Sequence, residues 1–151
     1  MYCFENQLVE LDLSRNTKLR VLSCDWNQLT ALDVSRNTEL GELWCTYNQL
    51  TTLNVNGVAA LQNLYCWENK LTKLDMSSNT DLRRLNCSNN QLTVTDLNDI
   101  FSSLSVIYIP PTISTKKDTQ VFHIWIVGNP GTSDCDINIA REKGWWVVTG
   151  L

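Results

Sequence analysis

The sequence lacks the residues that most catalytic and metal-binding schemes need. It has one histidine, His123, which excludes sites built from two histidines. Its six cysteines include no pair at the C-x₂₋₄-C spacing of zinc sites, so we expect neither a metal nor another cofactor. No apolar run approaches the roughly 18 residues of a membrane-spanning helix, so we expect no membrane insertion. No basic segment followed by an apolar one opens the sequence, and we expect no signal peptide among these residues.

The sequence also lacks a large excess of basic or acidic residues. The 151 residues carry 16 acidic and 12 basic side chains, for a net charge of -4. This balance gives no bulk electrostatic reason to bind nucleic acid or anionic lipid. Apolar residues make up 43% and charged residues 19% of the chain, which excludes a disordered or fibrous protein. The length suits a single domain with a core of its own.

What the sequence has instead is a repeat of 21 residues. Cysteine, asparagine and several leucines recur at this interval. The columns are cysteines at 3, 24, 45, 66 and 87, asparagines at 6, 27, 48, 69 and 90, and leucines at 8, 29, 50, 71 and 92, with further leucine columns beginning at 11, 19 and 22. So many columns in phase indicate structural units that stack on one another.

Each unit has the form L-x-x-L-x-C-x-x-N-x-L, as in Leu19, Leu22, Cys24, Asn27 and Leu29. This pattern resembles the leucine-rich repeat, with cysteine in the third leucine position. The remainder, T-x-L-D-V-S-x-N-T-x-L, resembles the 21-residue bacterial form of cysteine-ladder internalins of the internalin J type and of Bacteroidetes surface proteins. The resemblance implies an α/β fold, a right-handed leucine-rich repeat solenoid with a parallel β-sheet on its concave face. It also implies a secreted or cell-surface protein that binds another protein.

Strand alternation predicts which side chains enter the core. In a parallel stack, Leu22 and Cys24 point inward, while Val21 and Ser23 face the concave surface. Asn27 then leaves the strand at a turn, where its amide can donate to and accept from backbone groups that would otherwise be buried unpaired.

The return leg of each unit is too short for a full helix, so we expect extended or 3₁₀ segments there. In the third unit, Asn56-Gly57-Val58 replaces the usual Ser-Arg-Asn and predicts a tighter turn. Asp12, Asp33, Asn54 and Asp75 stack in register on this leg. They suggest either a Ca²⁺ site or, more simply, hydrogen bonds to turn backbone, which we favour.

The cysteine column predicts reduced, buried thiols rather than disulfides. Equivalent positions on adjacent parallel strands lie about 4.8 Å apart with side chains aimed the same way. A disulfide needs closer Cβ atoms and a χ₃ near 90°. The cysteine count therefore says nothing about the redox compartment.

The chain is expected to form one domain over 1–151, with regular repeats over 1–94 and irregular repeats and a cap over 95–151. Spacing predicts a helix over 95–104 capped by Thr95, a loop over 105–119 and a second helix over 134–143. Ser133 and Asp136 have capping-box spacing, Gly144 ends that helix, and the last strand follows at 145–148. At the other end, Met1 falls inside an uncapped strand. This favours a chain truncated at the N-terminus, with an end-to-end homodimer through that strand as the alternative.

Candidate ligand-binding residues come from the outward strand positions, which hold nearly all the tryptophan and tyrosine. Exposed aromatics indicate contact with a partner, and Trp and Tyr dominate binding hot spots. The candidates are Trp26, Glu42, Trp44, Tyr47, Tyr65, Trp67, Glu68 and Trp125. Alternatively, these side chains stack on each other or are covered by the loop over 105–119.

These features favour a non-catalytic recognition module with an aromatic and acidic binding face. A broad, shallow face suits a protein partner, and a glycan-binding surface adhesin is the alternative. An open sheet does not exclude water, and His123 has no cysteine or serine partner in its column. We therefore assign no catalytic residue and expect no enzymatic activity.

Overall fold

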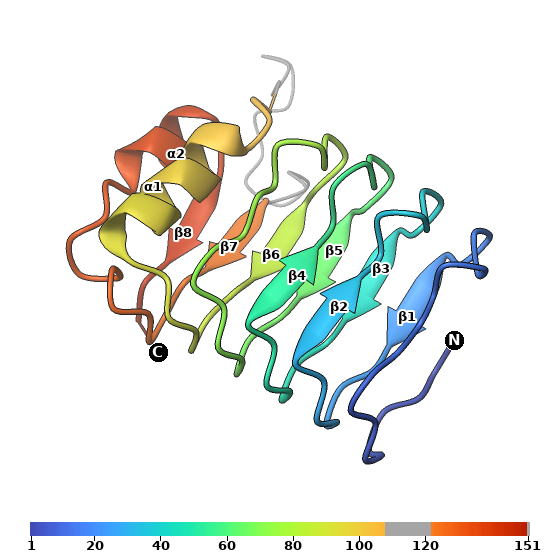
Figure 1. The fold of residues 1–151 in the computed structure, drawn as a ribbon. Helices are drawn as coiled ribbons and strands as arrows, with labels where there is room; N and C mark the ends of the chain where they lie inside the picture. Colours follow the sequence, from blue (N-terminus) through green and yellow to red (C-terminus); the bar gives the residue numbers. More distant parts are fainter. Residues whose placement is uncertain (108–121, 151) are drawn as a thin grey trace.

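The computed structural model describes residues 1–107 and 122–150. Figure 1 shows a stack of coils that runs from the N-terminal end to a pair of helices at the other end. The loop expected over 105–119 lies outside the described residues, apart from its first three positions.

A six-stranded parallel sheet in the order β1-β3-β5-β6-β7-β8 forms one side of the stack. Its strands are β1 (Val21–Ser23), β3 (Glu42–Trp44), β5 (Asn63–Tyr65), β6 (Arg84–Asn86), β7 (His123–Trp125) and β8 (Trp146–Val148). Tyr2 extends the sheet by a single parallel bridge to Ser23. The predicted solenoid with a parallel sheet is therefore confirmed.

The return legs lie on the opposite side of the stack (Figure 1). Two of them pair as a small parallel sheet of β2 (Ala31–Asp33) and β4 (Thr52–Asn54), so the predicted extended segments are confirmed there. After β6 and β7 the return legs contain helices instead, α1 (Val94–Ser103) and α2 (Asn138–Glu142).

The register of the sheet places the leucine column in the core. Leu22 pairs with Leu43 and Leu43 with Leu64, and all three side chains are fully buried. The inward direction predicted for the leucine and cysteine columns is thus confirmed. Burial of apolar surface along these columns is the main stabilising force of the stack.

The asparagine column connects each repeat to its neighbour. Asn48 Oδ1 accepts a hydrogen bond from the Leu29 N–H at 3.0 Å. Its Nδ2 lies within hydrogen-bond distance of the Cys24, Cys45 and Thr46 carbonyl oxygens at 3.0, 3.3 and 3.1 Å. Equivalent bonds are made at Asn27, Asn69, Asn90 and Asn129. The predicted role of this column is confirmed.

The cysteine column consists of free thiols. Cys24, Cys45, Cys66 and Cys87 are buried, whereas Cys3, in the first repeat, is half-buried. Each buried thiol donates to a carbonyl oxygen of the next strand at 3.5 Å, as Cys45 does to Tyr65. Burial raises the pKa of the Cys45 and Cys66 thiols well above the ordinary value and that of Cys87 to about 12. The buried thiols of this column therefore stay protonated and unreactive.

The helix ends differ from the sequence prediction. Thr93, not Thr95, caps α1, because the Asp96 N–H donates to Thr93 Oγ1 and the Thr93 N–H donates to Asp96 Oδ2. The helix over 134–143 is shorter than predicted. It begins at Asn138 with no side-chain cap, so the expected Ser133 and Asp136 capping box is wrong. Ser133 bonds Asp134 instead.

The tighter turn predicted in the third repeat is not found. The Val58 N–H donates to the Val55 carbonyl at 3.3 Å, the same chain spacing as the bond from Asn37 to Val34 at 2.8 Å. Gly57 has a φ of 79°, which a type II turn requires at this position. The substitution changes the type of the turn and not its length.

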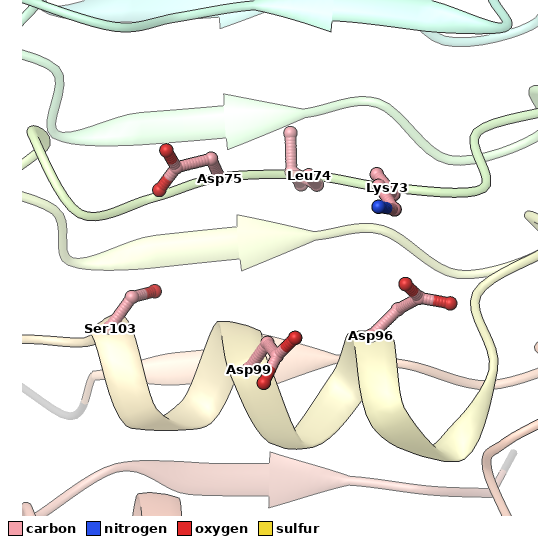
Figure 2. Close-up of a pocket in the computed structure, with 6 residues that line it drawn as sticks. All are labelled: Lys73, Leu74, Asp75, Asp96, Asp99 and Ser103. Atoms are coloured by element: carbon pink, nitrogen blue, oxygen red, sulfur yellow. The ribbon is translucent and has the colours of Figure 1, made fainter.

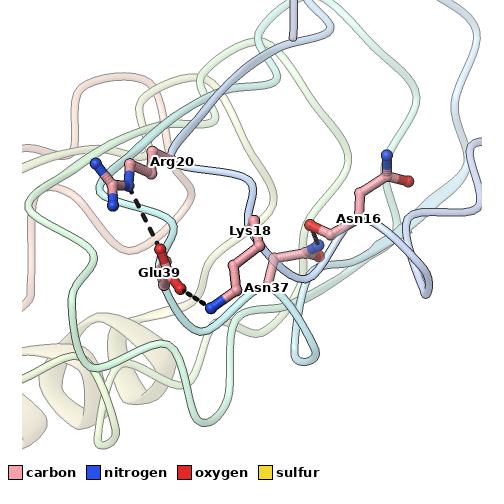
Figure 3. Close-up of polar contacts among 5 residues, drawn as sticks. All are labelled: Asn16, Lys18, Arg20, Asn37 and Glu39. Atoms are coloured by element: carbon pink, nitrogen blue, oxygen red, sulfur yellow. Dashed lines mark hydrogen bonds and ion pairs between the residues drawn. The ribbon is translucent and has the colours of Figure 1, made fainter.

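Asparagines of the return leg form a second column of bonds between repeats. Asn37 Nδ2 donates to the Leu13 carbonyl at 3.1 Å and to the Asn16 carbonyl at 2.8 Å. Figure 3 shows the bond to Asn16. Beside it, Glu39 forms ion pairs with Lys18 and Arg20 at 2.6 and 3.4 Å. These exposed pairs contribute little to stability.

Replacing Asn48 with alanine should lower the free energy of unfolding by about 1–3 kcal/mol, because buried backbone groups of two repeats lose their partner. Asn6, the exposed member of the same column, is the matched control, and Asn6→Ala should cost within about 0.5 kcal/mol. Urea denaturation of both variants measures the difference. Equal costs would show that the column does not connect the repeats.

Thiol titration under non-reducing conditions tests the cysteine ladder. In the native protein, Cys3 and Cys135 should react first, because the other four thiols are buried. After denaturation all six thiols should react. A lower total would mean that a disulfide is present.

Candidate functional site

A shallow hollow of about 480 Å³ lies on the outer face of the sheet, over β1, β3 and β5. We call it the aromatic groove. It is lined by Phe4, Glu5, Ser23, Asp25, Trp26, Trp44, Thr46, Tyr47, Tyr65 and Trp67. Six of these ten side chains are aromatic, whereas the two further hollows described below have no aromatic lining.

The rings of the groove form two rows. In one row, Trp26 stacks on Tyr47 with ring centroids 3.8 Å apart, and Tyr47 and Trp67 form a T-shaped pair with centroids 4.7 Å apart. In the other, Trp44 and Tyr65 lie parallel with centroids 5.7 Å apart. The alternative that these side chains stack on each other is therefore realised in part. Stacking leaves faces available, since Trp26 remains 54% exposed.

Three polar residues, Ser23, Asp25 and Thr46, form the floor of the groove. Asp25 Oδ1 accepts from the Thr46 N–H and hydroxyl, both at 2.8 Å, and its Oδ2 accepts from the Ser23 hydroxyl at 2.8 Å. Ser23 and Thr46 are buried although they face outward. These bonds hold the Asp25 carboxylate in one orientation.

A column of left-handed residues follows the strands. Glu5, Trp26, Tyr47, Glu68 and Asn89 have φ between 49° and 55°, and Gly128 occupies the corresponding position after β7. This conformation costs a non-glycine residue roughly 1–2 kcal/mol. It is held in place by backbone bonds, as from the Trp26 N–H to the Thr46 carbonyl at 3.0 Å. The cost is unexpected for rings unless their position is useful.

The structure brings together five of the eight predicted residues. Trp26, Trp44, Tyr47, Tyr65 and Trp67 line the groove. The remaining three predicted residues, Glu42, Glu68 and Trp125, do not line it.

Each of these three residues contacts a neighbour elsewhere on the sheet face. Glu42 accepts from Asn63 at 3.4 Å, and Glu68 accepts from Asn89 at 2.7 Å. Trp125 stacks with His123 at 5.0 Å on β7.

Five lining residues were not among the predicted site residues: Phe4, Glu5, Ser23, Asp25 and Thr46. All occupy the outward columns from which the prediction was drawn. Selection by aromatic character passed over the small polar residues, although the spacing of 21 from Asp25 to Thr46 places them on adjacent repeats.

A second hollow, of about 290 Å³, separates the return leg before β6 from α1. Figure 2 shows Lys73, Leu74 and Asp75 facing Asp96, Asp99 and Ser103 of the helix. Among the described residues, no group of three or more His, Cys, Asp or Glu side chains is arranged to hold a metal ion.

A third hollow, of about 770 Å³, lies along the return legs and is lined in part by Asp12, Asp33 and Asn54 of the column considered for Ca²⁺. Asp12, Asp33 and Asp75 each accept a hydrogen bond from a backbone N–H two residues on, at 2.8–2.9 Å. Hydrogen bonds from the serines that follow hold the carboxyl pKa values below the ordinary value, chiefly from the side chain of Ser35 at Asp33 and from the backbone of Ser14 and Ser77 at Asp12 and Asp75. These aspartates therefore stabilise the turns that follow them by hydrogen bonds to the backbone, as favoured from the sequence.

Comparisons with known proteins agree with this architecture. The family model described as Leucine Rich Repeat matches residues 81–104. Among solved structures, the functional domain of InlJ from Listeria monocytogenes, described as including a cysteine ladder, is 33% identical over 94% of this chain, with a TM-score of 0.58. The chain spans 37% of the length of that structure. No curated protein matches the chain in sequence. None of the described helices is long and apolar enough to cross a membrane.

Two variants of Glu68 test the left-handed column. Both Glu68→Gly and Glu68→Ala remove the bond to Asn89, so they differ mainly in backbone freedom. Because glycine adopts a positive φ without steric cost, Glu68→Gly should be the more stable of the two by about 1 kcal/mol. Thermal and urea unfolding measure the difference. The reverse order would show that this position is not left-handed.

Proposed function

Because the chain is a leucine-rich repeat protein of the cysteine-ladder type, we propose that it is a non-catalytic recognition module that binds a protein partner through the aromatic groove. The observation that carries this proposal is the gathering of six aromatic side chains from four consecutive repeats in one open hollow. Tryptophan and tyrosine are the residues that supply most binding energy at protein interfaces.

The shape of the site supports a protein rather than a small molecule. Small ligands are taken up by concave pockets that enclose most of their surface. The groove is shallow and continues into the outer face of a six-stranded sheet. A protein partner can cover such a face, whereas a small ligand on it would stay largely in water.

The polar floor also favours a protein over a glycan. Sugar recognition needs side chains with hydrogen-bonding capacity to spare beside the stacking ring. Here the Thr46 hydroxyl and the Ser23 hydroxyl already donate to Asp25. The floor therefore offers a ligand one free acceptor position on Asp25 Oδ2 and no free hydroxyl proton, so most of the binding there depends on the rings.

Preorganisation supports affinity at this site. Trp26 and Tyr47 are fixed by a left-handed backbone and by their mutual stacking at 3.8 Å. Rings that are already ordered lose little conformational entropy on binding. We extend the proposal to a secreted or cell-surface setting and an adhesive role, supported by the resemblance of the repeat to bacterial cysteine-ladder surface proteins.

Replacing Trp44 and Trp67 together with alanine should abolish binding of a protein ligand, because each hot-spot truncation costs about 2 kcal/mol or more. Both side chains are part-exposed, so the variant should stay folded with a modest loss from its ring contacts. Binders are selected from a library of displayed random peptides and, in parallel, from a glycan array. Their affinities are then measured by calorimetry.

Trp146→Ala is the matched control, since this ring is 63% exposed on β8, away from the groove. Peptide binders that lose affinity with the double variant and keep it with Trp146→Ala support the proposal. Binders found only on the glycan array, or peptides indifferent to the double variant, contradict it.

A further inference from the structure

The charged side chains that line the aromatic groove are all acidic. Its lining includes the carboxylates of Glu5 and Asp25 and no lysine or arginine. Among the outward residues of the described strands, basic side chains occur only at Arg84 and His123, on β6 and β7 beyond the groove. A ligand in the groove therefore meets a negative potential next to aromatic faces.

Neither carboxylate is neutralised within the described chain. The ion pairs there join Glu39 to Lys18 and Arg20, which are not part of the groove lining (Figure 3). Glu5 is exposed at the edge of the groove. Asp25 is held by three hydrogen bonds from uncharged donors, which orient its charge without cancelling it.

The bonds to Asp25 leave room for one further donor. Oδ1 accepts two hydrogen bonds and Oδ2 accepts one. A carboxylate oxygen accepts about two hydrogen bonds, so Oδ2 retains one acceptor position. Asp25 and both rows of rings line the same hollow, so a donor that reaches Oδ2 from the groove is close to the ring faces.

The rings provide the second half of a cation site. The face of an aromatic ring attracts a cation, tryptophan most strongly, and a planar guanidinium also stacks on it. Trp26 is 54% exposed and adjoins Asp25 in the sequence. Ring faces and an oriented carboxylate in one hollow suit a charged, planar group better than a neutral one.

We infer that the aromatic groove recognises an arginine side chain of the protein partner. The guanidinium lies against the ring faces and donates one N–H to Asp25 Oδ2, while Glu5 adds long-range attraction. This inference rests on the proposed function and names the chemistry of its partner. The partner segment is basic, which complements the carboxylates of the groove.

A pair of matched peptides tests the inference. One is a capped pentapeptide with a central arginine between serines and glycines, and the other carries citrulline, which has nearly the same shape and no charge. Both are titrated into the intact protein, and the indole N–H signals of Trp26, Trp44 and Trp67 are followed by NMR. The arginine peptide should shift these signals and bind at least about fivefold more tightly than the citrulline peptide. The preference should shrink at high salt.

Two variants test how much the carboxylates of Asp25 and Glu5 each contribute to binding of the arginine peptide. Asp25→Asn should weaken binding of the arginine peptide about tenfold, since it removes a charge-assisted bond. Glu5→Gln should weaken it about threefold through screened attraction alone. Glu142→Gln is the matched control, because it changes net charge equally at an exposed position on α2 and should leave binding unchanged. If Asp25→Asn unfolds the repeat, the comparison of Glu5→Gln with Glu142→Gln still tests the inference, because Glu5 is exposed and its substitution should leave the fold intact.

Equal binding of the two peptides, or no shift of the groove signals, would overturn the inference. If the Trp44 and Trp67 double variant still abolishes binding of the selected peptides in that case, the proposed protein recognition stands without arginine selectivity. If both results are negative, both proposals fail.

Discussion

The structure depends on buried backbone groups that only a neighbouring repeat can satisfy. The amide of Asn48 lies within hydrogen-bond distance of the Cys24 carbonyl of the preceding repeat and accepts from the Leu29 N–H, and all these groups are shielded from water. A repeat without its neighbour would leave them unpaired at a cost of about 1–3 kcal/mol each. Stacking is therefore obligatory, and every repeat has to present the same groups to its neighbour. The regular repeats do so at an interval of 21 residues, and the longer repeat that contains α1 does so through Asn129, 39 residues after Asn90.

The same constraint shapes the sheet face. Since the asparagine must reach its carbonyls immediately after the strand, the residue before it turns into the left-handed region, as at Trp26 and Tyr47. The turn places these rings in a row separate from Trp44 and Tyr65, and Asp25 and Thr46 line the same hollow. The shape of the groove is thus a consequence of the turn that the stack requires. The side chains that line it are outward residues that do not contribute to the core.

Prediction from sequence was weakest where the repeat ends. Over 95–151 no second copy of a pattern tells one threonine from the next. The helical spacing points to Thr95 as the cap, although Asp96 completes a capping box with Thr93. The shorter α2 has a related cause. Residues before Asn138 form turns, with the Cys135 N–H bonded to the Gly131 carbonyl at 3.0 Å, and Gly131 lies too close to the Thr93 and Val94 backbone for any larger residue.

The sequence by itself determined the solenoid, the inward leucines and cysteines, the role of the asparagines and the set of outward aromatic residues. It could do so because each repeat has the same surroundings, and one period therefore reveals the side-chain direction of every column. Only the tertiary structure decided which outward residues share a site. Glu42 and Glu68 bond to asparagines on neighbouring repeats, whereas Asp25 bonds to Thr46 and joins the groove. Such choices depend on contacts between side chains 21 residues apart, which periodicity places on adjacent strands but does not orient.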